Sequence, residues 1–251
     1  MAAKFVIVSA PRTGSTLLVK TLNQVEGICC HGELLLPKHV RGLEDGFDTY
    51  SASPEQRQAR ASDLLEDRNS DPVGFVSRAL ESAESAVGLK VIYEDLLKPR
   101  WRDVLAWLLQ QSDMHFIHLV RENTLRRYIS EQVMLAGGAI HSDMGGGSTR
   151  KAQVQIDPAA FQLRCQQIET EAAAVISALG AKPLLRVRYE DLASRLPETI
   201  NEICQFLDVS SGGNDMKPAL QKVGQHELEG VVLNYQDILQ HPVTRPFLQM
   251  D

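Results

Sequence analysis

The stretch KFVIVSAPRTGST, residues 4–16, decides the fold. Residues 4–10 form an apolar, β-branched run that predicts a buried strand, and residues 15–23 continue with helical spacing. A loop between a strand and a helix directs its backbone N–H groups, and the positive end of the helix dipole, toward any anion that it holds. Residues 10–16 therefore predict a phosphate-binding loop. A simple glycine-containing turn is the alternative interpretation.

The loop departs from the P-loop pattern GxxxxGK[ST] of nucleotide-binding proteins. Ser9 replaces the first glycine, whereas Gly14 matches the second. Thr16 keeps the hydroxyl, but Ser15 stands where the lysine belongs. Arg12, inside the loop, is then the only available cation. Because the missing lysine normally bridges the phosphates being cleaved, its loss argues against ATP or GTP as the substrate.

Strand and helix signals alternate along the rest of the chain, which is typical of a parallel sheet flanked by helices. Further strands are predicted at residues 87–92, 114–120 and 184–187, and helices at residues 54–68, 73–82, 101–110, 123–136, 157–179 and 197–207. We predict an α/β fold: a P-loop-like parallel β-sheet with helices on both faces, in a single domain over residues 1–251. Polar residues 37–72 predict an insertion over the sheet. Residues 137–150 are glycine-rich and predict a mobile loop, with a lid as one interpretation.

Composition narrows the class of protein. The 251 residues are 43% hydrophobic and 23% charged, as in a globular chain of fewer than two typical domains of roughly 150 residues. The net charge of −6 does not favour nucleic acid or a membrane surface as a partner. No apolar run reaches the roughly 18 residues of a membrane span, and the first residues lack a signal-peptide core, so we expect a cytoplasmic protein.

No metal site is expected. His115 and His118 lie three apart on one predicted strand, so they point to opposite faces. The four cysteines show neither a CxxC pair nor zinc-type spacing: Cys29, Cys30, Cys165 and Cys204. No sequence pattern indicates an oligomeric state.

Three motifs carry a resemblance to a known family. Residues 11–16, PRTGST, resemble the 5′-phosphosulfate loop of sulfotransferases that use 3′-phosphoadenosine-5′-phosphosulfate (PAPS). Arg121 at a strand end, with Ser130 on the next helix, resembles the family's 3′-phosphate site. Residues 188–192, RYEDL, resemble its strand-end Tyr-Glu-Asp element, which suggests a place for Tyr189 near the adenine. Residues 88–90 and 234–235 are similar to small bacterial carbohydrate-type members.

The resemblance implies PAPS as the donor and 3′-phosphoadenosine-5′-phosphate (PAP) as the product, with no metal required. It also implies an acceptor site formed by the insertion and the glycine-rich loop. The acceptor that the resemblance implies is a small molecule or carbohydrate that offers a hydroxyl, in preference to an amine. The implied donor-binding residues are Arg12, Thr13, Gly14, Ser15, Thr16, Arg121, Ser130 and Tyr189.

Two departures from the family pattern affect the 3′-phosphate site. The spacing from Arg121 to Ser130 is nine, where eight is commonest, so an extra residue in the bend or a role for Arg126 or Arg127 is needed. The basic, glycine-containing Arg-Lys-Gly loop is absent, and its substitutes could be Lys217 and Lys222. A solvated helix face is the alternative interpretation of Arg126 and Arg127.

Sulfuryl transfer requires aligned atoms, a stabilised leaving phosphate and a base for the acceptor proton. Arg12, the loop amides and the Ser15 or Thr16 hydroxyl are expected to stabilise the leaving group. Glu33 lies about where bacterial carbohydrate-type sulfotransferases place a glutamate, and it is the predicted general base. His31 is the second candidate. A surface carboxylate or an ion-pair partner is the alternative interpretation of Glu33.

Two other functions remain open at this point. One is a P-loop-type kinase of a small molecule, with Asp95 or Asp191 as a metal ligand. The other is a non-catalytic nucleotide-binding protein that keeps the loop without turnover.

Overall fold

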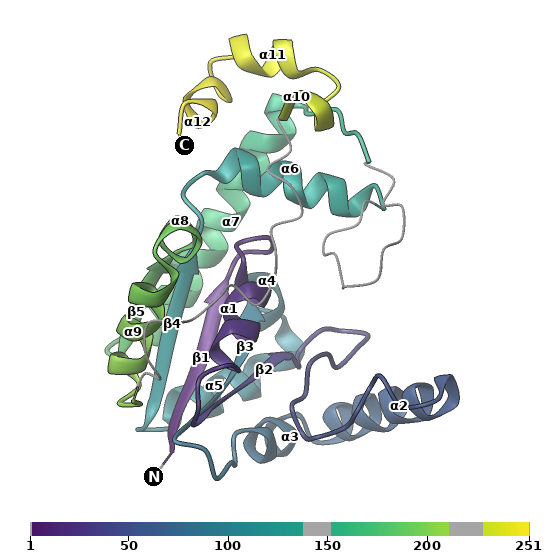
Figure 1. The fold of residues 1–251 in the computed structure, drawn as a ribbon, viewed down its shortest axis with the longest axis vertical. Helices are drawn as coiled ribbons and strands as arrows, with labels where there is room; N and C mark the ends of the chain where they lie inside the picture. Colours follow the sequence, from purple (N-terminus) through teal and green to yellow (C-terminus); the bar gives the residue numbers. More distant parts are fainter. Residues whose placement is uncertain (1, 138–151, 211–227, 251) are drawn as a thin grey trace.

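A computed structural model describes residues 2–137, 152–210 and 228–250. Its centre is a five-stranded parallel sheet in the order β2-β3-β1-β4-β5 (Figure 1). The strands are β1 Ala3–Ser9, β2 Ile28–Glu33, β3 Ala86–Ile92, β4 Met114–Val120 and β5 Leu184–Arg188. Because the sheet is parallel, the carboxyl ends of all five strands meet at one edge. The predicted α/β fold is confirmed.

Helices cover both faces of the sheet (Figure 1). One face carries α1 Ser15–Leu22, α8 Tyr189–Ser194 and α9 Leu196–Phe206; the other carries α3 Pro72–Ala79, the 3-10 turn η1 Pro99–Trp101, α5 Arg102–Gln110 and α7 Pro158–Leu179. The side chains of β1 alternate between these layers. Phe5 and Ile7 pack on the first face, whereas Val6 and Val8 pack on the second, and all four are fully buried. This double burial explains the continuous apolar run of the strand.

A third apolar cluster lies beyond the carboxyl edge of the sheet (Figure 1). It joins the start of α7 to α6 Thr124–Leu135, α10 Leu228–Val231, α11 Tyr235–Gln240 and α12 Arg245–Leu248. Asn123 fixes α12 to this layer, because its side-chain amide donates to the carbonyls of Phe247 and Met250. Among the described residues, no helix combines the length and apolar character needed to cross a membrane.

The strand β2 was not predicted. Its sequence, ICCHGE, is short, lacks an apolar alternation and carries a register shift between His31 and Glu33. As an edge strand it pairs only with β3, so it needs less of the β-branched character that marks the central strands.

The insertion at residues 37–72 contains α2 Pro54–Ser70, which projects away from the sheet (Figure 1). Arg68 ties this helix to the chain after β2. Its guanidinium is fully buried and donates to the carbonyls of Leu34 and Leu36 at 2.8 and 2.7 Å. Most of the predicted loop at residues 137–150 lies outside the described residues.

One sequence motif occurs twice at the carboxyl edge. The first YEDL motif, Tyr93–Leu96, follows β3 and forms α4 Tyr93–Leu96. The second YEDL motif, Tyr189–Leu192, follows β5 and begins α8. In both, the acidic pair occupies the first turn, where it complements the positive end of the helix dipole.

Candidate active site

The loop after β1 has the backbone of an anion cradle. Arg12 and Gly14 have positive φ values of 66° and 85°, and Thr13 between them does not. Backbone of alternating hand turns successive N–H groups toward one point, and α1 begins at the next residue. Thr13 braces the loop by donating its hydroxyl to the carbonyl of Ala10 at 2.9 Å. The predicted phosphate-binding loop therefore has a geometry suited to an anion.

Tyr189 closes one side of this loop. A Cβ atom on Gly14 would lie only 2.5 and 2.8 Å from ring carbons of Tyr189, so no larger residue fits there. The Arg121 guanidinium carbon lies 4.4 Å from the centroid of the same ring. The second YEDL motif therefore meets the phosphate loop and the end of β4 at one place.

Arg121 and Ser130 also reach the loop. Arg121 donates from Nη1 to the carbonyl of Arg12 at 3.2 Å, and Arg12 donates from Nε to the Ser130 hydroxyl at 3.1 Å. Burial, and then the neighbouring Arg121 cation, lower the pKa of Arg12. The Nε of Arg121 is buried and has no hydrogen-bond partner among the described residues. Two adjacent cations with a spare buried donor suit an anionic ligand.

Lys90 is a functional candidate that the sequence interpretation missed. Its Nζ donates to the Thr16 hydroxyl at 2.9 Å and lies 3.2 Å from Oε1 of Glu33. The interpretation of Arg12 as the only available cation was therefore wrong, because β3 supplies the missing ammonium from beside the loop. Burial lowers the pKa of Lys90, and the Glu33 carboxylate opposes that shift. The signal was present in the sequence as a lysine inside a buried strand.

Glu33 and His31 have different surroundings. The Glu33 side chain is 25% exposed and ends beside Lys90. The His31 ring is buried, with Nε2 at 2.7 Å from the carbonyl of Ala79 and Nδ1 accepting the Glu44 N–H at 3.0 Å. These bonds fix the tautomer and occupy both nitrogens, and burial lowers the pKa of His31. The contacts of His31 therefore argue against a role as the base, because neither ring nitrogen is free to take a proton.

Arg127 is not on a solvated face, which was one interpretation of this residue. Its side chain is 2% exposed and its Nη1 lies 2.9 Å from Oε2 of Glu131. Lys217 and Lys222, the other substitutes considered for the 3′-phosphate site, lie outside the described residues.

The two carboxylates considered as metal ligands for a kinase are both paired with cations. Asp95 accepts from Lys98 at 2.5 Å, and Asp191 accepts from Arg195 at 2.9 Å. No group of three His, Cys, Asp or Glu side chains suited to a metal ion occurs within residues 2–137, 152–210 and 228–250.

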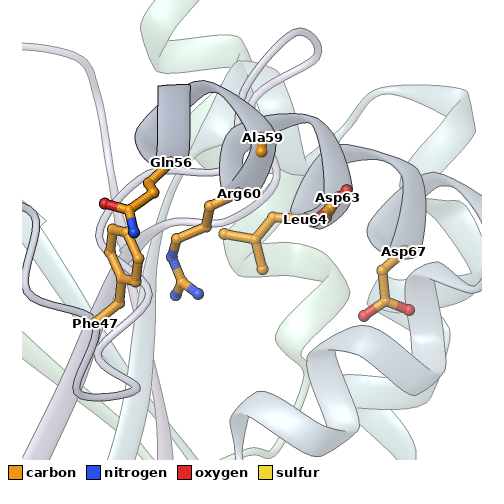
Figure 2. A pocket seen from close by; sticks show the side chains of 7 residues that line it. All are labelled: Phe47, Gln56, Ala59, Arg60, Asp63, Leu64 and Asp67. Carbon is orange, nitrogen blue, oxygen red and sulfur yellow. The ribbon is translucent and has the colours of Figure 1, made fainter. Parts of the chain in front are cut away.

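A separate pocket of about 450 Å³ lies within the insertion (Figure 2). Figure 2 shows side chains along one side of α2, with Phe47 at one end beside Gln56 and Arg60. The lining residues are Phe47, Gln56, Ala59, Arg60, Asp63, Leu64 and Asp67. It shares no residue with the cluster around the phosphate loop. The insertion also reaches the strand of Glu33, because the N–H of Gly32 donates to the Gly42 carbonyl at 2.7 Å.

Comparison with known proteins identifies the family to which the chain belongs. A nucleotide-type loop at the edge of a parallel α/β sheet defines the class, and a model of the sulfotransferase family matches residues 4–211. The chain belongs to the sulfotransferase family. The expected membership of the PAPS-dependent sulfotransferases, as an enzyme, is thereby confirmed.

Solved structures agree with the fold. The sulfotransferase domain of the curacin biosynthetic pathway is 18% identical, with a TM-score of 0.51 over 84% of this chain and 75% of that one. The sulfotransferase domain of the Synechococcus PCC 7002 olefin synthase is 20% identical, with a TM-score of 0.50 over 100% of this chain and 89% of that one. A search of curated protein sequences found no match.

Proposed function

We propose that this enzyme transfers the sulfuryl group of PAPS to a hydroxyl of a small-molecule or carbohydrate acceptor, with Glu33 as the general base. The observation that carries this proposal is the meeting of Glu33, Lys90 and the Thr16 hydroxyl at the mouth of an anion-binding loop. A base, a cation and the cradle for a leaving phosphate are the parts that the reaction needs.

The donor site is built around the loop. The amides of residues 12–16 hold the 5′-phosphate, and Tyr189 sets the width of the cradle by packing on Gly14. Arg121 and Ser130 bind the 3′-phosphate. The unpartnered Nε of Arg121 supports this assignment, because a buried guanidinium donor is costly unless a ligand uses it.

In the transfer step, the acceptor oxygen attacks sulfur and its proton passes to the Glu33 carboxylate. A new oxygen–sulfur bond forms as the bond from sulfur to the phosphate oxygen breaks, and PAP leaves. Lys90 and Arg12 stabilise the charge that develops on the leaving phosphate. Lys90 also holds the Glu33 carboxylate at 3.2 Å, which orients the base beside the loop.

The acceptor site involves the insertion. The pairing of Gly32 with Gly42 supports this assignment, because it sets residues of the insertion beside the strand that carries Glu33. The insertion is polar, and charged side chains that include Asp63 and Asp67 line its pocket, which suits a hydroxylated acceptor better than a purely apolar one.

Two experiments test the proposed function. Isothermal titration should detect binding of PAP but not of ATP with magnesium. Incubation with PAPS and a metabolite extract should give a product heavier than its precursor by one SO₃ group. Tight magnesium-dependent ATP binding without PAP binding would instead support a kinase, and PAP binding without any sulfated product would support a non-catalytic protein.

A further inference from the structure

Two arginines donate hydrogen bonds to backbone carbonyls of the phosphate loop. Arg127 donates from Nη1 to the carbonyl of Pro11 at 3.4 Å, as Arg121 does to the carbonyl of Arg12 at 3.2 Å. The described peptide bonds are all trans, and in a trans peptide the C=O and N–H groups point in opposite directions. Holding these two carbonyls therefore turns the N–H groups of Arg12 and Thr13 toward the other side.

Arg127 is itself held by a buried network. The Nη1 that contacts the loop also lies 2.9 Å from Oε2 of Glu131, one helical turn later. The other carboxylate oxygen of Glu131 accepts from Arg164 of α7, at 2.7 Å from Nη2. The side chains of Arg127 and Glu131 are only 2% and 10% exposed, so water competes little for these bonds. We refer to Arg127, Glu131 and Arg164 as the buried brace.

We infer that Arg127 is a positioning residue, and that the buried brace sets the direction of the Arg12 amide in the phosphate loop. This inference rests on the proposed function, which takes the anion in the loop to be the 5′-phosphate of PAP. It differs from the hypothesis that Arg127 binds the 3′-phosphate. Arg127 already pairs with Glu131, and its Nη1 atom is shared between Glu131 and Pro11.

One observation supports the competing role of Arg127 as a ligand of the 3′-phosphate, so the test must separate the two roles. Nη2 of Arg127 is buried and has no hydrogen-bond partner among the described residues, so a 3′-phosphate could use it. Adenosine 3′-phosphate separates the two roles, because it carries the 3′-phosphate of PAP but has no 5′-phosphate to enter the loop.

The experiment measures the affinities of both nucleotides for Arg127→Lys and Glu131→Gln. Lysine is shorter and cannot keep both contacts of the guanidinium, and glutamine keeps the shape of the Glu131 side chain without its charge. We expect PAP binding to weaken about tenfold, the value of one charge-assisted contact, while adenosine 3′-phosphate binding stays unchanged. Arg78→Gln, which removes an arginine from exposed ion pairs on α3, is the matched control and should change neither affinity.

Two results would overturn the inference. An equal loss for both nucleotides would make Arg127 a 3′-phosphate ligand, and unchanged PAP binding in both variants would leave the carbonyl contact without a role. If the wild-type protein bound neither nucleotide, the proposed function would fail, yet the inference could still be tested in the free protein. The NMR order parameter of the Arg12 amide should fall from about 0.85 to below about 0.6 in Arg127→Lys, and an unchanged value would refute the brace.

Discussion

The two YEDL motifs share their sequence and local structure but place their tyrosines in different surroundings. Tyr93 is 2% exposed, and its hydroxyl lies 2.6 Å from Nε2 of His118 on β4. Tyr189 packs instead on Gly14 and under the guanidinium of Arg121. The first tyrosine therefore contributes to the core, whereas the second lines the candidate donor site.

The basic residues before the two motifs show the opposite pattern, because here the first motif is the one beside the candidate site. A basic residue stands three positions before each tyrosine, Lys90 in one case and Arg186 in the other. Lys90 is buried and reaches the phosphate loop and Glu33, whereas Arg186 is exposed. The reason is the strand order, since β3 lies between β2 and β1, and β5 is an edge strand beside β4.

The acidic residues divide as the tyrosines do, with the residue of the second motif serving the candidate donor site. Glu190 accepts the N–H groups of Glu122 and Asn123 at 3.1 and 3.2 Å, which fixes the chain between Arg121 and α6. Glu94 is exposed and pairs with Lys98 at 3.7 Å. A repeated motif thus specifies how a helix starts, and the neighbouring strand decides whether its residues serve packing or binding.

The comparison predicts that catalysis depends on the strand before the first motif, because its Lys90 pairs with Glu33. Glu33→Gln tests this prediction and should have the largest effect. Loss of the proton acceptor should lower turnover of sulfated product about a hundredfold or more, because glutamine cannot take the proton. PAP affinity, measured by titration, should stay nearly unchanged. Turnover close to that of wild type would rule out Glu33 as the base.

Lys90→Met should lower turnover by about a hundredfold, the usual cost of removing one donor that stabilises a transition state. Arg186→Met is the matched control, because it removes the basic residue at the same position before the other tyrosine. Turnover rates of both variants, with melting temperatures to verify folding, make the test. Equal losses in the two variants would remove the asymmetry between the motifs.

Arg121→Ala should affect binding at the second motif. We expect PAP affinity to fall about ten- to a hundredfold, because a charge-assisted contact contributes roughly 1.5–3 kcal/mol. Adenosine 5′-phosphosulfate has no 3′-phosphate, so its affinity should fall less than that of PAP, through loss of the Arg121 contact with the loop carbonyl of Arg12 alone. Ser130→Ala should show the same selectivity with a smaller loss. Equal weakening of both nucleotides would make Arg121 a structural residue of the loop.

Much of the fold followed from sequence because the central strands are buried on both sides. The strand at residues 114–120 is predicted with the same ends that the structure shows, since an apolar run there is bounded by polar residues. The edge strand β2 escaped prediction because pairing with β3, and not its composition, holds it in the sheet.

The candidate site was predictable only where its parts are close in sequence. Residues 10–16 reveal a strand, loop and helix in one run. By contrast, His31 contacts Ala79 and Glu44, which lie 48 and 13 residues away, and Lys90 contacts Thr16 across 74 residues. Such contacts depend on strand order, which no local pattern contains. Lys90 could not be placed beside Arg12 from the sequence for this reason.

The smallest effects should come from the tyrosines themselves, and they test the division of roles most directly. Tyr93→Phe leaves Nε2 of His118 without its hydroxyl partner in the core, so the free energy of unfolding should fall by about 1–3 kcal/mol while PAP affinity stays constant. Tyr189→Leu removes the ring beneath Arg121 and beside Gly14, so PAP affinity should fall about three- to tenfold, the range of a modest cation–π contact. Its stability should change less than that of Tyr93→Phe, because Tyr189 is less buried. Denaturant unfolding and PAP titration on the same two proteins measure both quantities. If Tyr93→Phe weakened PAP binding as much as Tyr189→Leu, the tyrosines would share one role despite their different contacts, and the division between packing and binding would be wrong.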